Sequence, residues 1–388
     1  MRRFLLIAFA VTVGGTTPLA ADETLDSDLT PRLANASATR VPMPARNRPS
    51  GDEAEPFELV GERIPPGSFR RLSWAATELF DGVSLATPVL VAHGAHPGQV
   101  LCLTAAVHGD ELNGIEIVRR ILHGLEPTGL TGTVVGVPIV NIQAFRRGSR
   151  YLPDRRDLNR HFPGSPDGSA ASRIAHSLFS NIVTHCDALV DLHTGSMERT
   201  NLPQLRADLS HAGVATLTKG FGATVVVNSQ PRVGTLRSAA TRAGIPTLTF
   251  EAGGPEQLDP EEIAHGVRGI EALLHSLGMV SETRPRKARE ATYVSSSWVR
   301  ADVGGILMSE IELGSEVRKG DVLGRLIDPI TNEITAIHAP GTGRIIGMAR
   351  NQIVMPGFAT YHIGTDGRGK SDRVAPPMPD HEPSDTSE

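Results

Sequence analysis

Two periodicities alternate along the middle of the chain. Short apolar runs of strand length are followed by stretches in which apolar residues recur at helical spacing. The predicted strands are 69–75, 88–92, 100–107, 133–140, 188–192, 224–227 and 246–250, and the predicted helices are 113–122, 170–185, 213–220, 236–243 and 261–277. Apolar strands that alternate with helices favour a largely parallel or mixed sheet covered on both faces. The fold class predicted for residues 56–285 is therefore α/β.

The pattern changes near residue 285. From 286 to 366, short β-like runs are separated by closely spaced glycines, which is typical of a small β-sandwich or barrel. We therefore predict a second, C-terminal β domain at residues 286–366. The remaining residues, 367–388, are polar, rich in proline and acidic near their end, and they are predicted to be a disordered tail.

The first residues have the parts of an export signal. Two arginines precede a short apolar stretch at 4–13, and small residues lead to Ala20 and Ala21. We predict a signal peptide at 1–21, with an uncleaved membrane anchor as the alternative. Residues 22–55 lack periodicity and are predicted to be a disordered lead-in. No later apolar run reaches membrane-spanning length, so we expect an exported, periplasmic protein with no membrane span after signal cleavage.

The composition narrows the classes of function. The 388 residues carry 38 lysines and arginines against 43 aspartates and glutamates, so no basic surface for nucleic acid is predicted. The hydrophobic fraction of 39% is enough for a sizeable core. Cys102 and Cys186 cannot form a disulfide framework by themselves. Because each lies next to an apolar run, buried thiols are the favoured interpretation and a disulfide is the alternative.

Three metal-binding side chains follow predicted strands, at the edge where open α/β sheets form their sites. His108 and Glu111 lie three residues apart across a strand-to-helix turn, so both can face one point, and His193 follows the strand at 188–192. Two imidazoles and a carboxylate leave the fourth position of a tetrahedral zinc ion open, as catalysis requires. We predict one Zn²⁺ per chain at these residues; the alternative for His108 is a helix-capping or otherwise satisfied polar residue.

A zinc hydrolase also needs a base that takes a proton and returns it to the leaving amine. Glu251 follows the strand at 246–250 and is the candidate. The small residues after it, Ala-Gly-Gly, would let a substrate approach closely. The alternative for Glu251 is an ion pair with an arginine.

The loop at 141–164 is locally cationic within an acidic protein. It carries Arg150, Arg155, Arg156 and Arg160. Guanidinium groups bind carboxylates or a developing oxyanion, which is the functional interpretation of this loop. For Arg155 and Arg156, a solvated loop is the favoured interpretation.

Four motifs in this order, HGDE, GSRYLPDRRDLNRHFPG, DLHTG and FEAGG, resemble the succinylglutamate desuccinylase/aspartoacylase family, a branch of the zinc carboxypeptidase-like fold. The resemblance covers about residues 90–280. It implies the same zinc ligands and the same base, and it assigns four further residues: Arg150 to the oxyanion, Asn159 and Arg160 to the substrate carboxylate, and Asp157 to a place behind a zinc-binding histidine. Arg199 and Arg237 are further candidates for contact with the substrate.

The C-terminal residues resemble the lipoyl/biotinyl-like β domain of related proteins, through the segments 317–324 and 337–343. The modified lysine of such domains would lie at 328–333, and this segment has no lysine. No attached prosthetic group is therefore predicted, and we expect the domain to shape the mouth of the site.

These features predict a zinc-dependent amidohydrolase that acts on an N-acyl amino acid or a similar small anionic amide. Two alternatives stay open. One is an exported zinc carboxypeptidase or amidase acting on peptides, such as cell-wall peptides, and the other is a non-catalytic binding protein on a degenerate enzyme fold. A site covered by the C-terminal domain would favour small acylated amino acids, and an open one would favour peptides. The sequence leaves the oligomeric state, including a homo-oligomer, undecided.

Overall fold

The computed structural model describes residues 54–78, 84–222, 224–281 and 292–365. The predicted signal peptide, most of the lead-in, the boundary near 285 and the tail lie outside these residues. Ala54 and Glu55, which we assigned to the lead-in, belong to the fold. Ala54 is buried and its N–H donates to the carbonyl of Ala95 at 2.9 Å, and the carbonyl of Glu55 contacts His93 at 2.8 Å. Within the described residues, no helix combines the length and apolarity needed to cross a membrane.

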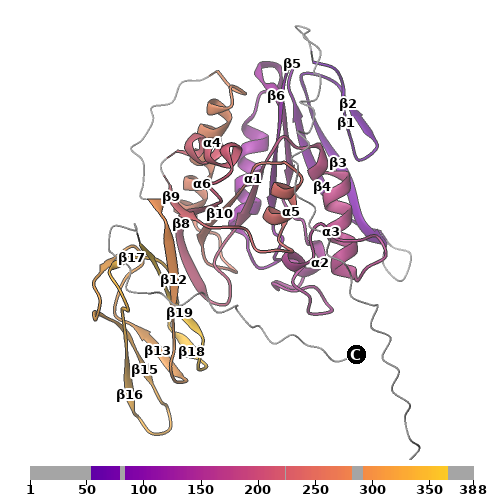
Figure 1. The fold of residues 1–388 in the computed structure, drawn as a ribbon. Helices are drawn as coiled ribbons and strands as arrows, with labels where there is room; N and C mark the ends of the chain where they lie inside the picture. Colours follow the sequence, from indigo (N-terminus) through magenta and orange to yellow (C-terminus); the bar gives the residue numbers. More distant parts are fainter. Residues whose placement is uncertain (1–53, 79–83, 223, 282–291, 366–388) are drawn as a thin grey trace, which may run out of the picture. The chain divides into compact units, whose positions relative to one another are not determined.

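One large mixed sheet organises the described residues, with the strand order β12-β19-β17-β8-β10-β7-β5-β6-β4-β3 (Figure 1). Its N-terminal members are β3 (Ser68–Glu78), β4 (Ser84–His93), β5 (His96–Ala105), β6 (Thr131–Val137), β7 (Ala188–His193), β8 (Arg199–Ala207) and β10 (Thr247–Gly253), and β9 (Val225–Asn228) pairs with β8. Strand β7 is parallel to both of its neighbours, β5 and β10. The carboxyl ends of these three strands therefore meet at one edge of the sheet.

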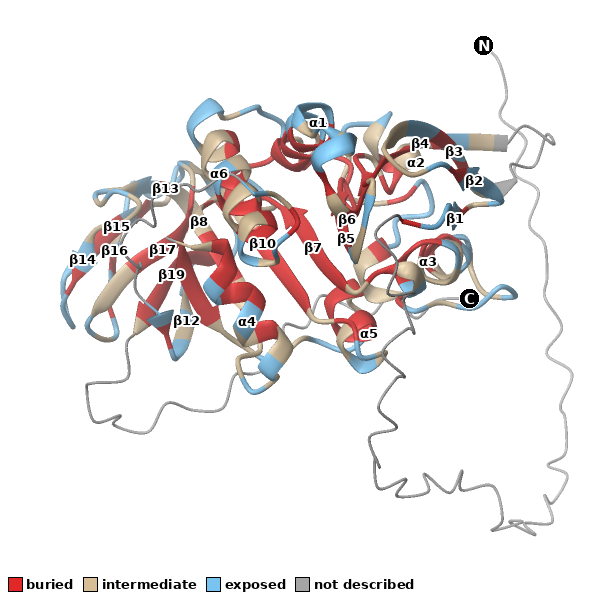
Figure 2. Cartoon of the chain, turned by 90° about the horizontal axis from the view of Figure 1, so that it is seen from above, coloured by how far each residue is buried: buried red, intermediate tan, exposed pale blue. Residues whose placement is uncertain are grey.

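Helices cover both faces of this sheet (Figures 1 and 2). On one face, α1 (Asn113–Gly124), α4 (Ala212–Phe221) and α6 (Pro260–Ser276) share one hydrophobic cluster with Leu101 and Leu103 of β5. On the other face, α3 (Ala170–Asn181), α5 (Leu236–Arg242) and the hairpin of β1 (Phe57–Leu59) and β2 (Glu62–Ile64) share a second cluster with Val100 and Cys102. Because both sets of alternate side chains are buried in β7 and in the second half of β5, these segments are near-continuous apolar runs, which made them recognisable in the sequence.

The α/β prediction and the mixed sheet are confirmed, since each predicted strand and helix between 69 and 277 overlaps an observed one. Strand β8 was not predicted. It contains Pro203, which lacks an N–H and is unusual inside a sheet. On one side of β8, Arg199–Asn201 pair with β17 and Gln204–Ala207 pair with β9, so Pro203 lies between the two paired segments.

The C-terminal strands divide between two sheets. A four-stranded sheet has the order β16-β15-β13-β18, while β12, β17 and β19 extend the large sheet through the pairing of β17 with β8. The bounds are β11 (Thr292–Tyr293), β12 (Ser295–Arg300), β13 (Gly305–Ser309), β14 (Glu316–Val317), β15 (Val322–Ile327), β16 (Ile334–His338), β17 (Gly343–Ala349), β18 (Gln352–Val354) and β19 (Ala359–Thr365). Leu307, Leu326, Ile345 and Tyr361 form a hydrophobic cluster that joins the two sheets. The predicted C-terminal strands are thus present, and the lipoyl/biotinyl likeness stays a prediction.

The favoured interpretation of the cysteines was wrong. Cys102 of β5 and Cys186, two residues before β7, form a disulfide, with their Cα atoms 5.8 Å apart. The cysteines are 84 residues apart in the chain, so only the parallel pairing of β5 with β7 brings them together. Both are buried in the same hydrophobic cluster, which is what their apolar neighbours had indicated.

Removal of this disulfide is expected to destabilise the protein. A cross-link that closes a long loop restricts the unfolded chain, and its loss costs about 2–5 kcal/mol of unfolding free energy. We expect the Cys102→Ala/Cys186→Ala variant to unfold at a lower denaturant concentration than the wild type, measured by circular dichroism. Dithiothreitol should lower the midpoint of the wild type and leave that of the variant unchanged. An identical midpoint for the oxidised and reduced wild type would contradict the expectation.

Candidate active site

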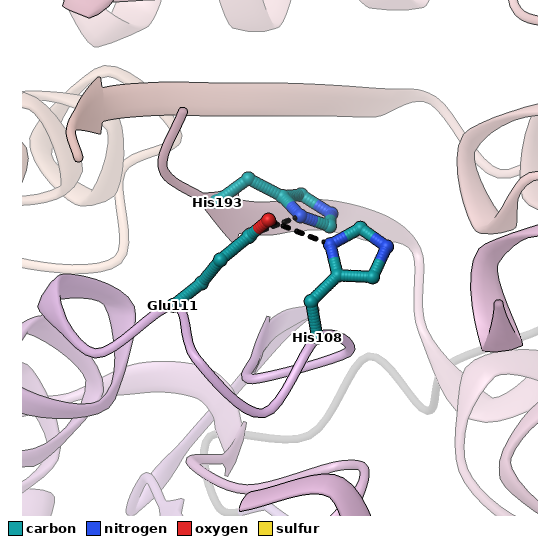
Figure 3. Close-up of side chains that lie close together, drawn as sticks. All are labelled: His108, Glu111 and His193. Carbon is teal, nitrogen blue, oxygen red and sulfur yellow. Dashed lines mark hydrogen bonds and ion pairs between the residues drawn. The ribbon is translucent and has the colours of Figure 1, made fainter. Parts of the chain in front are cut away.

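Three side chains converge at the carboxyl edge of the sheet (Figure 3). His108 and Glu111 lie in the loop between β5 and α1, and His193 is the last residue of β7. The two carboxylate oxygens of Glu111 each lie 2.7 Å from the Nδ1 atom of one histidine. Each residue offers one potential ligand atom, and these three atoms all lie within 4.8 Å of one another. The structure therefore brings together the three residues that the sequence placed at a metal.

The loop that carries His108 is packed tightly against the cationic loop at 141–164. The N–H of Gly109 donates to the carbonyl of Ser149 at 3.0 Å, and a Cβ atom at Gly109 would overlap the backbone after Ala144. Only glycine fits this contact. The packing brings Arg150 to the cluster, where its Nη1 atom lies 3.3 Å from Oε1 of Glu111.

An aspartate contacts the second ring nitrogen of each histidine. Asp157 lies 3.1 Å from Nε2 of His108, and it accepts a hydrogen bond of 2.8 Å from Arg150. Asp191 lies 2.8 Å from Nε2 of His193. Asp157 therefore lies behind the ring of His108. Asp191 was not predicted, although the sequence Asp-Leu-His on a strand places the aspartate and the histidine on one face.

The charges of this cluster are strongly coupled. Burial alone would raise the pKa of Glu111, but His108 and His193 hold it well below its usual value. Burial alone would lower the pKa of His193, but Asp191 and Glu111 raise it well above its usual value. Each imidazole is thus held between two carboxylates, where a positive charge is favoured.

The donor set fits a zinc ion. Two imidazole nitrogens and one carboxylate face a common point, and a bound dication would replace the protons on the facing nitrogens. The aspartates behind the rings would fix the orientation of each ligand, as is usual for zinc-binding histidines.

Glu251 of β10 lies beside His193. The two residues are register partners on neighbouring parallel strands, so their side chains lie on the same face of the sheet. One oxygen of Glu251 forms an ion pair of 2.8 Å with Nε of Arg206, and the other accepts a hydrogen bond of 2.8 Å from Asn201. The arginine contact that we weighed as the alternative for Glu251 is therefore present. The Glu251 side chain is 15% exposed, so a substrate can reach it.

The pair assigned to the substrate carboxylate lies next to Asp157. The N–H of Asn159 donates to Asp157 at 2.8 Å, and its side-chain oxygen accepts from the N–H of Leu236 at 2.8 Å. Arg160 is about one-third exposed, its Nη2 atom lies 3.7 Å from Oδ2 of Asp157, and it lines a cavity of about 460 Å³ that none of the three clustered residues lines. This arrangement leaves the Arg160 side chain accessible to an anion.

The remaining arginines have other surroundings. Arg155 and Arg156 are exposed, and Arg156 forms an ion pair of 2.7 Å with Asp154, which agrees with a solvated loop. Arg199 lies over the rings of Trp298 and Phe358, 5.2 Å from each centroid. A separate case is Arg237, which is buried and donates to the carbonyl of Ser229 at 3.0 Å. Burial and the neighbouring Arg206 lower the pKa of Arg237 to about 10.

The two residues that hold Glu251, Asn201 and Arg206, were missed because β8 was not predicted. The glycines after Glu251 also have a different role from the one expected. A Cβ at Gly254 would overlap the guanidinium of Arg350, and one at Gly253 would lie 2.8 Å from the amide nitrogen of Asn113. The space beside these glycines is therefore filled by the protein's own side chains.

Comparison with known proteins relates this chain to a family. Residues 97–277 match the succinylglutamate desuccinylase/aspartoacylase catalytic domain. A curated relative, the N-alpha-acetyl-L-2,4-diaminobutyric acid deacetylase of Halomonas elongata, is 29% identical over 304 residues, which span 74% of this chain and 86% of the relative. These likenesses support the succinylglutamate desuccinylase/aspartoacylase family for this chain.

Solved structures of other proteins share the fold. The product-bound ectoine utilization protein EutE of Ruegeria pomeroyi is 25% identical, with a TM-score of 0.71, over 80% of this chain and 99% of that protein. A succinylglutamate desuccinylase/aspartoacylase of Rhodobacter sphaeroides is 26% identical, with a TM-score of 0.70, over 81% of this chain and 100% of that protein. Both likenesses extend beyond residues 97–277. The likeness to deacylases supports hydrolase activity for this chain.

Proposed function

We propose that this protein is an exported, zinc-dependent amidohydrolase that cleaves the amide bond of an N-acyl amino acid or a similar small anionic amide. The observation that carries the proposal is the convergence of His108, Glu111 and His193 on one point, with Glu251 beside His193 on the next strand. The deacetylase from Halomonas elongata, which acts on an N-acetylated amino acid, supports the same reaction class.

In the proposed reaction, a bound zinc ion and the side chains around it have separate roles. Bound zinc would polarise the amide carbonyl and lower the pKa of water at the site. Glu251 accepts the proton of the attacking water and delivers it to the nitrogen of the leaving amine. We assign to Arg150, whose guanidinium lies 3.3 Å from Glu111, the stabilisation of the oxygen on which negative charge develops.

An anionic substrate suits the cations around the site. Arg160 is accessible beside the cluster, and we assign the substrate carboxylate to Arg160 and Asn159. We favour small substrates over peptides because Arg350, between β17 and β18, fills the space beside Gly254. The disulfide between Cys102 and Cys186 supports export, since disulfides persist in oxidising compartments.

A substrate panel tests this proposal. The purified protein is incubated with N-acetyl and N-succinyl derivatives of acidic, neutral and diamino acids and with short peptides, and new amines are detected. We expect an N-acyl amino acid to be hydrolysed, the activity to be lost with a chelator and zinc to restore it. Release of amines from peptides alone would favour the carboxypeptidase alternative. No released amine from any compound, with zinc bound, would favour the non-catalytic alternative.

A further inference from the structure

The carboxylate of Glu251 is held at two points by one strand, β8. Nδ2 of Asn201 donates to Oε2 at 2.8 Å, and Nε of Arg206 lies 2.8 Å from Oε1. Oε2 therefore accepts a hydrogen bond, and Oε1 has an ion-pair partner whose Nε–H is not aligned for a hydrogen bond, so the two contacts together restrain the position of the carboxylate. Neither partner belongs to the four motifs by which the family was recognised.

The C-terminal strands support this arrangement from the other side of β8. Asn201 is the register partner of Gly347 on β17. A Cβ atom at Gly347 would lie only 2.5 Å from Oδ1 of Asn201, so the Asn201 side chain occupies the space that the glycine leaves free. Gln204 of β8 also donates to the carbonyl of Ile346 at 2.9 Å. The placement of Asn201 therefore depends on β17.

The register partner of Asn201, Gly347, is itself paired with a residue of the next C-terminal strand, β19. Gly347 pairs with His362 of β19, whose ring stacks on Trp298 at 4.6 Å between centroids. Burial, and then the nearby Arg206 and Arg199, lower the pKa of His362 well below its usual value. The ring is therefore uncharged, and among the described residues Arg206 has Glu251 as its ion-pair partner.

We propose that Asn201 and Arg206 are positioning residues for Glu251, and that β17 takes part in positioning through Gly347. The role of Glu251 as the base rests on the function proposed above, whereas the contacts that hold it do not. A base must lie within hydrogen-bond reach of the proton it accepts, and a displacement of about 1 Å costs about 10²-fold in rate. The C-terminal strands thus form part of the catalytic framework.

Kinetics of single variants test the proposal. We expect Asn201→Ala and Arg206→Gln to lower kcat by about 10–100-fold, with KM and zinc content close to the wild type. Arg206→Lys should recover part of the loss, because lysine keeps the charge without the guanidinium geometry. Gly347→Ala should also lower kcat, because the added Cβ atom would displace the Asn201 side chain. Gly341→Ala is its matched control, because a Cβ at Gly341 meets no atom within 4 Å and kcat should be retained.

A double-mutant comparison separates positioning from other roles. In a Glu251→Asp background the carboxylate is withdrawn from both partners, so Asn201→Ala should cause a smaller further loss there than in the wild type. An equal loss in both backgrounds would reject positioning, and so would a raised KM with unchanged kcat, which indicates contact with the substrate.

Crystal structures of the wild type, Asn201→Ala and Gly347→Ala give a readout that needs no substrate. A displaced or rotated Glu251 carboxylate in both variants supports the proposal, and a carboxylate that stays in place overturns it. This holds even if the wild type hydrolyses none of the amides, in which case the function proposed above fails by itself.

Discussion

Glu251→Gln is expected to abolish most turnover while leaving one zinc ion per chain. The substitution keeps the size of the side chain but removes the group that accepts a proton, and general acid–base catalysis contributes about 10²–10⁴-fold. Because Glu251 is not one of the three clustered ligands, metal binding should be unaffected. The rate on the best substrate of the panel should therefore fall by about this factor, with zinc measured by elemental analysis on the same sample.

The matched control for this variant is Glu333→Gln, which makes the same chemical change at an exposed residue of the turn between β15 and β16. It should retain the rate of the wild type. Turnover retained in Glu251→Gln would reject Glu251 as the base. Loss of zinc from that variant would instead show that Glu251 contributes to metal binding.

The part of the site at strand ends was predictable, and the part held within a strand was not. His108, Glu111 and His193 follow strands with continuous apolar runs, and the carboxyl ends of parallel strands meet at one edge. Asn201 and Arg206 lie inside β8, where Pro203 interrupts the strand pattern and no apolar run marks the segment. Their contact with Glu251 arises from pairing between β8 and β10, which local periodicity does not encode.

Contacts between distant segments account for the other differences. The disulfide forms only because β5 and β7 lie side by side. The apolar residues next to each cysteine predict that the cysteine is buried, but they do not predict the distance between Cys102 and Cys186. Gly254 was taken as room for a substrate, but a guanidinium from Arg350, 96 positions further along the chain, occupies that space. The continuation of the catalytic sheet into the C-terminal strands was hidden for the same reason, since it depends on the pairing of β8 with β17.

His108→Ala is expected to lose most of the bound metal and, with it, the activity. The substitution removes one of three ligands, and it also leaves Glu111 with a single histidine and Asp157 without the ring that it contacts. Loss of a carboxylate behind a ligand already costs about 10–100-fold in metal affinity, so loss of the ligand itself should exceed this range. Zinc retained after dialysis against a weak chelator, quantified by elemental analysis, measures the effect.

The surroundings of His108 also predict how the metal loss should be distributed among variants. His96→Ala, at the exposed start of β5, removes an imidazole far from the cluster along the same strand and should retain zinc. Asp157→Asn keeps the ligand but weakens the contact behind it, so its affinity should lie between those of the wild type and His108→Ala. Full zinc occupancy in His108→Ala would refute the three-ligand site. Equal losses in Asp157→Asn and His108→Ala would mean that the orientation of the imidazole matters as much as its presence.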